Sequence, residues 1–230
     1  GSLSDGLLKA LDTTSKEAKK VETTNTEAYE FYLKAKHKYE KRENTDDTEI
    51  ARGLLQKAIE LDDNLIRAKT LLGTTYLEMG DYDKAMEIYT PALIQAEELG
   101  DKSGMGYSLL NIGSVNHDKG DYDKALDYYE RSLAMQEELG DKREMGMCLN
   151  NIGLVHYNKG DLDKALDYYE RSLAIKEELG DKHDGISLTN IGLVHHDKGD
   201  YDKALDYYNR SLAIDEELGD KHGMGISLNN

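Results

Sequence analysis

Several residue types are scarce or missing in the 230-residue sequence. It holds one cysteine (Cys148), one proline (Pro91), one phenylalanine and no tryptophan. A single thiol cannot close a disulfide within the chain, so we expect a reducing, cytoplasmic compartment. No apolar run approaches the ~20 residues that span a bilayer, so we expect no membrane partner. The lone proline falls inside an expected helix, where its missing N–H predicts a local kink.

Positive charge is also in short supply. The chain has 29 Lys and Arg residues against 46 Asp and Glu residues, which gives a net charge of −17. Nucleic-acid binding needs Lys and Arg side chains clustered along a phosphate backbone, so this balance argues against a nucleic-acid partner. Charged residues make up 33% of the chain. Apolar residues nevertheless keep a regular spacing, which excludes a disordered acidic tail.

The sequence also lacks the motifs that carry catalysis. It shows no nucleophile–base pair, glycine-rich phosphate loop or metal-hydrolase motif, so we expect no enzyme, no catalytic residues and no cofactor. Histidines beside acids, at His117–Asp118 and His196–Asp197, are the residue types of a metal site. Adjacent helical residues point about 100° apart, so His195 and His196 should not share one site. Packing or exposure of these histidines is therefore favoured over metal binding.

What the chain has in abundance is internal repetition. The stretch from Asn151 to Ala174 has close copies beginning at Asn111 and Asn190, and a weaker copy beginning at Leu71. The weaker copy spaces small and aromatic residues at offsets of 0, 3, 7, 12, 16 and 19, as Gly73, Tyr76, Gly80, Ala85, Tyr89 and Ala92. This spacing resembles the tetratricopeptide repeat, a pair of antiparallel helices. The later copies keep the first glycine (Gly113, Gly153, Gly192) and the second tyrosine (Tyr129, Tyr169, Tyr208).

The resemblance implies an all-α fold, a right-handed solenoid of antiparallel helix pairs. We divide the chain into a linker or N-terminal helix with a cloning remnant (1–23), a first pair (26–63), four repeats (65–99, 104–139, 144–179, 184–218) and a truncated first helix of a sixth repeat (222–230). Each second helix is followed by a glycine suited to a left-handed helix end, at Gly100, Gly140, Gly180 and Gly219. The register that usually holds a packed tyrosine holds Asn116, His156 and His195.

The repeats are longer than usual for this family. Gly80, Gly120 and Gly160 follow one another at 40 residues, and Gly199 follows after 39, whereas the common period is about 34. This spacing resembles the repeats of kinesin light chains and of Pins-type scaffolds, which are peptide-binding proteins. The pair at 26–63 resembles instead the start of tetratricopeptide regions in bacterial multidomain signalling proteins.

Resemblance to these peptide-binding proteins implies an inner groove lined by the first helices, with an asparagine ladder that holds an extended peptide. The ladder register holds Asn111, Asn151, Asn190 and Asn230. An amide both donates and accepts hydrogen bonds, so it can hold a peptide backbone whatever the peptide's side chains. The alternative is that these asparagines bond neighbouring loops or merely reflect duplication of the repeat. The other residues expected in the groove are Tyr107, Ser114, His117, Asp118, Met147, Asn150, Leu154, Tyr157, Asn158, Ile186, Thr189, Leu193, His196 and Asp197.

These features predict a protein–protein interaction scaffold that binds an extended or partly helical peptide in the concave groove. Two other interpretations stay open. One is self-association, a homodimer through the C-terminal end, where Met224, Ile226 and Leu228 lack a partner helix. The other is a regulatory sensor region of a larger signalling enzyme, such as a cyclase, or of a transcription regulator. A protein or peptide is the expected partner.

Overall fold

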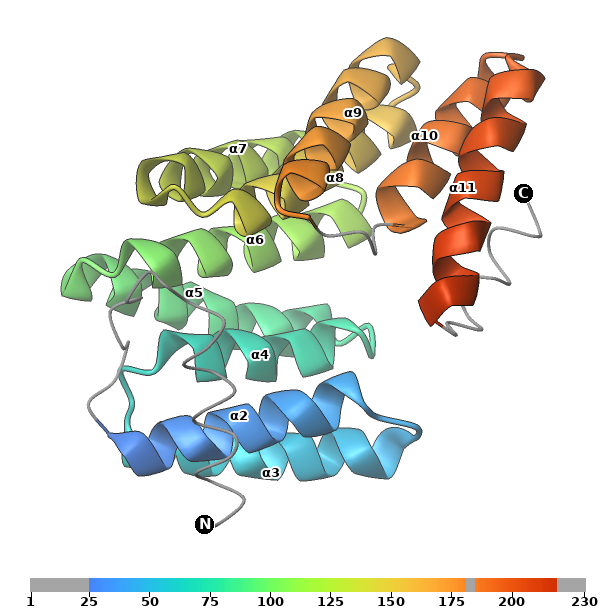
Figure 1. Ribbon diagram of the computed structural model, residues 1–230. Coiled ribbons are helices and arrows are strands. Elements are labelled where there is room, and N and C mark those ends of the chain that lie inside the picture. The colour runs from blue at the N-terminus through green and yellow to red at the C-terminus, as the bar shows by residue number, and fades with distance from the viewer. Residues whose placement is uncertain (1–24, 181–184, 219–230) are drawn as a thin grey trace. The chain divides into compact units, whose positions relative to one another are not determined.

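The computed structural model describes residues 25–180 and 185–218. All regular secondary structure in these ranges is helical and arranged in pairs, which confirms the predicted all-α fold (Figure 1). Within the same ranges, no helix is both long and apolar enough to cross a bilayer. The chain divides into two compact units, Gly1–Leu72 and Gly73–Asn230, and the boundary falls inside helix α4 (Ile66–Leu77).

The first unit contains one complete helix pair, α2 (Thr26–Glu40) and α3 (Thr45–Leu61). Each helix is capped by an asparagine, because the Asn25 side chain accepts a hydrogen bond from Ala28 N and the Asn44 side chain accepts one from Asp47 N. Alanines let the two helices approach closely, and larger side chains fill the space beside them. The buried apolar residues of the pair are Ala28, Tyr32, Ala35, Tyr39, Ala51, Leu55 and Ala58.

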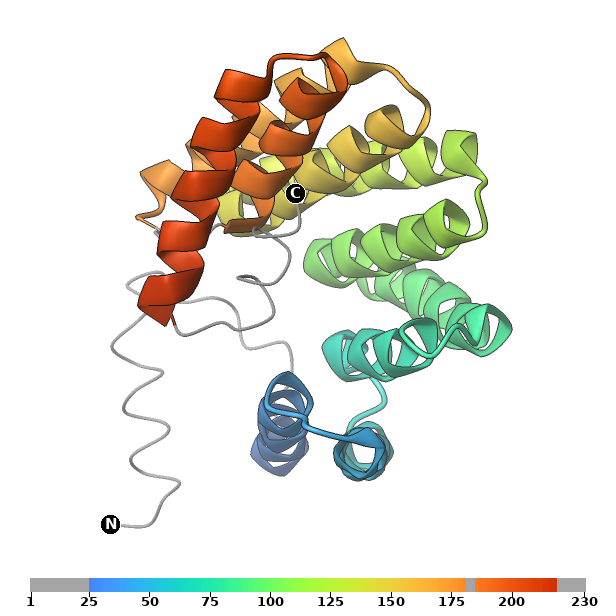
Figure 2. The ribbon, with the colours of Figure 1, turned by 90° about the vertical axis from the view of Figure 1, so that its right-hand side faces the viewer.

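The second unit continues with α4 from Gly73 and alternates first and second helices. Its helices are α5 (Tyr82–Leu99), α6 (Lys102–Asp118), α7 (Tyr122–Leu139), α8 (Lys142–Asn158), α9 (Leu162–Glu178), α10 (Gly185–Asp197) and α11 (Tyr201–Leu218). Helices α6 and α7, α8 and α9, and α10 and α11 pack as pairs, and Figure 2 shows α10 beside α11. Helix α5 runs without interruption although Pro91 lies inside it. The kink at Pro91 stays a prediction.

In each pair of the second unit, a tyrosine ring of the second helix lies directly on a glycine of the first helix. A Cβ atom added to Gly153 would lie 2.8 Å from the ring of Tyr169. Real Cβ atoms essentially never approach other atoms that closely, so only glycine fits at this place. The same contact recurs at Gly73–Tyr89, Gly113–Tyr129 and Gly192–Tyr208. All four tyrosines are buried.

A buried serine of the second helix holds each of the first helices α6, α8 and α10 nearer to its start. The Ser172 hydroxyl of α9 donates a hydrogen bond to the Gly146 carbonyl of α8 at 2.7 Å. Ser132 and Ser211 make the same bond to Gly106 and Gly185, each at 2.8 Å. The tyrosine–glycine contact and this bond therefore fix α6, α8 and α10 against their second helices at two points.

Helix ends follow the predicted chemistry. Gly100, Gly140 and Gly180 have φ values of 64°, 67° and 69°, which confirms the left-handed helix ends; Gly219 lies outside the described residues. The first helices of the repeats placed at 104–139 and 144–179 begin at Lys102 and Lys142. The reason is capping: the side chains of Asp101 and Asp141 accept hydrogen bonds from Gly104 N and Glu144 N.

The second helices α5, α7 and α9 are each covered by the first helix of the next pair. Ile112 and Val115 of α6 form one apolar cluster with Ala85 and Tyr89 of α5, and the cluster also contacts Tyr82 and Met86. The equivalent residues are Ile152 and Val155 for α8 on α7, and Ile191 and Val194 for α10 on α9. One kind of interface is therefore repeated three times along the unit.

Replacing Gly153 by alanine tests the close approach of the paired helices. The added methyl group would overlap the Tyr169 ring, and overpacking of this kind costs about 1–3 kcal/mol. We expect a lower midpoint of urea unfolding, followed by circular dichroism, at an unchanged slope. Gly146→Ala in the same helix is the matched control, because its Cβ would meet only ordinary contacts from 3.7 Å outward. Equal midpoints for the two variants would contradict the packing argument.

Candidate functional site

The residues predicted to bind peptide occupy one set of registers on α6, α8 and α10, and this set is called the first-helix face. Helix α8 contacts both α6 and α10. The face comprises Tyr107, Asn111, Ser114, His117 and Asp118 of α6, Met147, Asn150, Asn151, Leu154, Tyr157 and Asn158 of α8, and Ile186, Asn190, Leu193, His196 and Asp197 of α10, all half-buried or exposed. Thr189 was also expected there but is buried, because its hydroxyl bonds Ser211 at 2.8 Å. Asn230 lies outside the described residues.

Asn111 is tied into the protein interior by both ends of its amide. Its Nδ2 donates to the carbonyl oxygen of Tyr107 at 2.8 Å, one turn earlier in α6. Its Oδ1 accepts from the Thr74 hydroxyl at 3.3 Å and lies 3.4 Å from the Tyr89 hydroxyl. At this position the bonds join neighbouring helices of the protein itself.

The asparagines of α8 and α10 are placed differently. Asn190 Nδ2 donates to Asn150 Oδ1 at 3.1 Å, so one amide pair bridges the two first helices. The half-buried amide of Asn151 makes no hydrogen bond with the described part of the chain. One residue type in equivalent registers therefore has three different environments.

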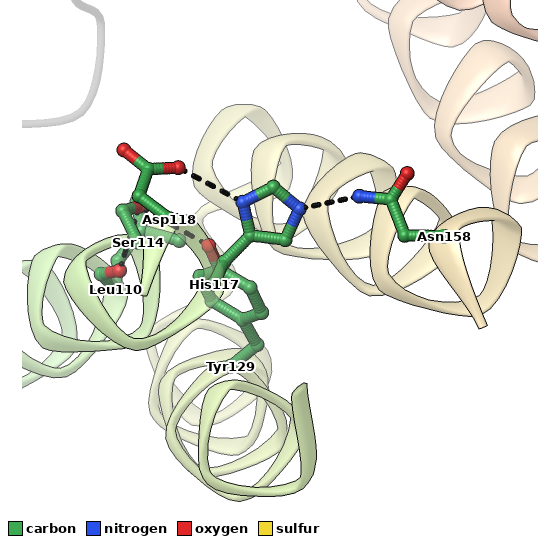
Figure 3. Close-up of polar contacts among 6 residues, drawn as sticks. All are labelled: Leu110, Ser114, His117, Asp118, Tyr129 and Asn158. Atoms are coloured by element: carbon green, nitrogen blue, oxygen red, sulfur yellow. Dashed lines mark hydrogen bonds and ion pairs between the residues drawn. The ribbon is translucent and has the colours of Figure 1, made fainter. Parts of the chain in front are cut away.

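A histidine bridges α6 and α8 at the far end of the face, as Figure 3 shows. Asn158 Nδ2 donates to His117 Nε2 at 2.8 Å, and His117 Nδ1 lies 3.0 Å from Asp118 Oδ1. An accepting Nε2 places the ring proton on Nδ1, where it is donated to the carboxylate. Nearby, the Tyr129 hydroxyl donates to Ser114 Oγ at 3.2 Å, and Ser114 donates to the Leu110 carbonyl oxygen at 3.1 Å.

The step from α8 to α10 has the same bridge with different residues. The Tyr157 hydroxyl donates to Asp197 Oδ2 at 2.7 Å, and Asp197 Oδ1 lies 3.2 Å from His196 Nδ1. The tyrosine bond and then the histidine bond lower the pKa of Asp197. Burial, and then the bond to this carboxylate, raises the pKa of Tyr157 to about 12. Tyr157 therefore stays a donor and Asp197 a charged acceptor through the neutral pH range.

The face also exposes apolar side chains. Ile186 is 68% exposed and Met147 is 43% exposed. Leu154 and Leu193 are half-buried at the register between the asparagines and the bridging residues. The face thus combines aliphatic surface, amides and two carboxylates, which suits recognition of a peptide better than it suits bond-making chemistry.

The remaining reactive side chains are used in packing. His156 stacks on Tyr168 with ring centroids 5.5 Å apart, and His195 stacks on Tyr207 at 5.6 Å. This is the packing expected for their register. Burial raises the pKa of the Cys148 thiol to about 12, so the thiol is not a nucleophile at neutral pH. Among the residues that the structure describes, no three His, Cys, Asp or Glu side chains are grouped to hold a metal ion.

Sequence reasoning missed the polar contacts between repeats. Tyr107 donates to Glu144 Oε1 at 2.9 Å, and Lys119 and Lys159 pair with Asp83 and Asp123 of the preceding second helices at 3.1 and 2.5 Å. The ion pairs are exposed and contribute little stability. All of these contacts join residues 36 or 37 positions apart in the sequence, close to the repeat period. This constant separation in the sequence could have indicated which polar residues meet between neighbouring repeats.

Comparison with known proteins decides the family. A family model described as "Tetratricopeptide repeat" matches residues 64–138 and 144–217. The chain belongs to the tetratricopeptide repeat family. As a tetratricopeptide repeat protein it is a protein–protein interaction scaffold, and no catalytic family is indicated. A search of the curated proteins found no match.

Solved structures share the tetratricopeptide repeat fold at low identity. BtubC (BKLC) from P. vanneervenii is 23% identical and aligns over 85% of this chain and 91% of its own, with a TM-score of 0.63. A Rap protein complexed with Competence and Sporulation Factor is 17% identical over 96% of this chain and 60% of its own, with a TM-score of 0.75. The STAND protein PH0952 from Pyrococcus horikoshii, which has a tetratricopeptide repeat sensor, is 19% identical over 87% of this chain and 32% of its own, with a TM-score of 0.71. These identities show the fold alone.

Replacing His156 by asparagine should make the protein less sensitive to acid. Burial first, and then the positive charge of Lys164, lowers the pKa of His156. The folded state therefore holds the ring neutral. An unfolded histidine has a pKa of about 6.5, and above this pH the stabilising contribution of the neutral ring is fully present. The contribution is lost as the pH falls toward the lower pKa of the folded state. Asparagine fits this register, because Asn116 donates to the Ile112 carbonyl oxygen there at 2.8 Å.

The measurement is the fall in melting temperature between pH 7 and pH 5. It should be smaller for His156→Asn than for the wild type. His196→Asn serves as the control, because it makes the same replacement at a histidine that is half exposed beside Asp197. A fall as large in His156→Asn as in the wild type would exclude His156 as a source of acid sensitivity.

Proposed function

We propose that the first-helix face binds a peptide segment of a partner protein, in an extended or partly helical form. The observation that carries this proposal is the uncommitted Asn151 amide, which shares a face with the exposed side chains of Met147 and Ile186. Apolar side chains contribute affinity when they leave water, and amides contribute directed bonds to a peptide main chain.

Two further observations support a peptide partner. A Rap protein with this fold was solved as a complex with Competence and Sporulation Factor. The net charge of −17 favours a neutral or basic peptide and disfavours a nucleic acid.

The single buried thiol, Cys148, fits a reducing compartment, and we place the protein in the cytoplasm. A sensor role within a larger signalling protein stays a prediction.

Selection of peptides on the purified protein tests the proposal. A random dodecapeptide library displayed on phage is selected on the wild type, and enriched peptides are measured by fluorescence anisotropy. We expect Met147→Glu/Ile186→Glu to weaken their binding by roughly tenfold or more, because it places charge on the apolar surface. Ala134→Glu/Ala174→Glu is the control, since it adds the same charge at exposed positions of α7 and α9. Failure to enrich any peptide, or equal loss in both variants, would refute binding at this face.

Self-association through the C-terminal end is the second candidate, and α11 gives an observation in its favour. Tyr201 and Leu205 are 65% and 59% exposed. Their equivalents in the preceding second helices, such as Leu162 and Leu166 of α9, pack against the Ile–Val cluster of the next first helix. Helix α11 thus presents the apolar face that is covered in the three preceding second helices, and we propose a second copy of the chain as its occupant. Met224, Ile226 and Leu228 lie outside the described residues.

Sedimentation velocity at increasing protein concentration tests this second candidate. We expect a dimer whose population falls in Leu205→Glu, because the new carboxylate would be buried in the interface. Ala213→Glu is the matched control, since it adds the same charge at an exposed position of α11. A wild type that stays monomeric, or a dimer that survives Leu205→Glu, would exclude association through this face.

A further inference from the structure

We infer that copies of this chain associate head to tail, with a basic face of α2 of one copy covering the exposed face of α11 of the next copy. The inference rests on the self-association proposed above, because it names the surface of the second copy that occupies α11. It differs from a symmetric contact between two α11 helices, in which one face would meet itself.

The covered second helices show what α11 still requires. Lys119 of α6 pairs with Asp83 of α5 at 3.1 Å, and its Nζ lies 5.9 Å from the centre of the Tyr82 ring. A lysine of the next first helix pairs in the same way with α7 and with α9. The equivalent residues of α11 are exposed, and we call Tyr201, Asp202 and Leu205 the α11 face. The Asp202 carboxylate has no ion-pair or hydrogen-bond partner in the described part of the chain.

Helix α2 carries a lysine at the register that α11 requires. Ala35 is fully buried in the pair of α2 and α3, as Gly113 is buried in the pair of α6 and α7. Lys119 stands six residues after Gly113, and the residues that cover α5 stand one before and two after that glycine. The same offsets from Ala35 define the outer α2 face, which consists of Lys34, His37 and Lys41, all exposed.

The charges of the outer α2 face are only partly offset within the helix itself. Lys34 lies 3.7 Å from Glu30, and both side chains are exposed, so this pair contributes little energy. Lys41 has no ion-pair partner among the described residues. Lys41 of one copy and Asp202 of the next are therefore the lysine and the aspartate that pair at each covered step.

The distribution of charge along the chain favours this contact over a symmetric one. Residues 73–230 hold 32 of the 46 acidic residues and 16 of the 29 basic ones, whereas residues 1–72 hold 14 and 13. Residues 34–42 include four lysines and one arginine against one glutamate, and residues 201–218 include five acids against two bases. Opposite charges therefore attract α2 to α11, while two α11 helices would repel each other.

The outer α2 face is more polar than the faces that cover α5, α7 and α9, because Lys34 and His37 replace the isoleucine and the valine. A polar outer face by itself keeps a terminal repeat soluble. The methylene groups of a lysine nevertheless pack on apolar surface, and Lys34 Nζ already lies 5.4 Å from the centre of the Phe31 ring. The contact between copies is thus reversible and sensitive to ionic strength.

Head-to-tail association leaves one free face of each kind on every assembly. The dimer expected above is therefore its first product, and further copies add to it through the same contact.

Sedimentation velocity of two variants, alone and mixed, tests the inference. Lys34→Glu/Lys41→Glu alters only the outer α2 face, and Leu205→Glu alters only the α11 face. We expect each variant alone to associate roughly tenfold or more weakly than the wild type. An equimolar mixture should form a dimer and nothing larger, because one intact face of each kind remains.

Lys124→Glu/Lys164→Glu is the matched control, since it reverses the charge of two exposed lysines on α7 and α9. It should associate like the wild type, and circular dichroism should show the same helix content and melting temperature in all variants. Added salt should weaken association of the wild type, because it screens the attraction between α2 and α11. Salt would strengthen a contact between two acidic α11 helices.

The outcomes separate this inference from the proposed self-association. Wild-type association in Lys34→Glu/Lys41→Glu, a mixture that stays monomeric, equal loss in the control, or association that salt strengthens would each overturn the head-to-tail contact. If Leu205→Glu still abolishes association in those cases, self-association through α11 stands with another geometry. A wild type that stays monomeric at every concentration removes both.

Discussion

A tyrosine ring lying on a bare glycine sets the distance between the two helices of every pair in the second unit. With Tyr169 on Gly153, the backbones approach closely, and any side chain at the glycine would force them apart. The bond from Ser172 to Gly146 then fixes the rotation of the first helix about its own axis. This rotation decides which residues of the first helix turn away from the second helix. Packing against the second helix therefore places the side chains of Met147, Asn151 and Asn158 on the first-helix face.

On the first-helix face, some side chains are hydrogen-bonded to a neighbouring helix and others are exposed without such a bond. Its far end is held by bridges between consecutive first helices, from His117 to Asn158 and from Tyr157 to Asp197. Groups that hold the helices together are poor candidates for partner binding, because their bonds would first have to break. The surface between these bridges and the helix starts carries the exposed apolar side chains, and the peptide proposed for this face would bury them.

Residues that pack within one pair could be predicted from the sequence, because their spacing recurs with the chain. The recurring spacing was sufficient to predict the small residue at Gly153, the left-handed conformation of Gly140 and the packing of His156. Contacts between repeats were not. Whether an asparagine is bonded depends on a residue far away in sequence, as with Asn111 and Thr74, which are 37 positions apart. Copies that look alike therefore differ in the hydroxyl or methyl groups that their neighbours supply.

The recurring interface between a second helix and the next first helix also shapes how the chain folds. Helices α5, α7 and α9 each offer an alanine–tyrosine surface, and α6, α8 and α10 each cover it with an isoleucine–valine pair. A newly formed first helix therefore fits more than one second helix. Looping out a whole pair adds little closure entropy, since each doubling of a loop costs only about 0.6 kcal/mol. The copies differ at few positions, among them His156 and His195, and these two stack on tyrosines of their own second helices and not on the preceding ones. Making the copies identical would leave each interface intact and slow folding through misordered intermediates.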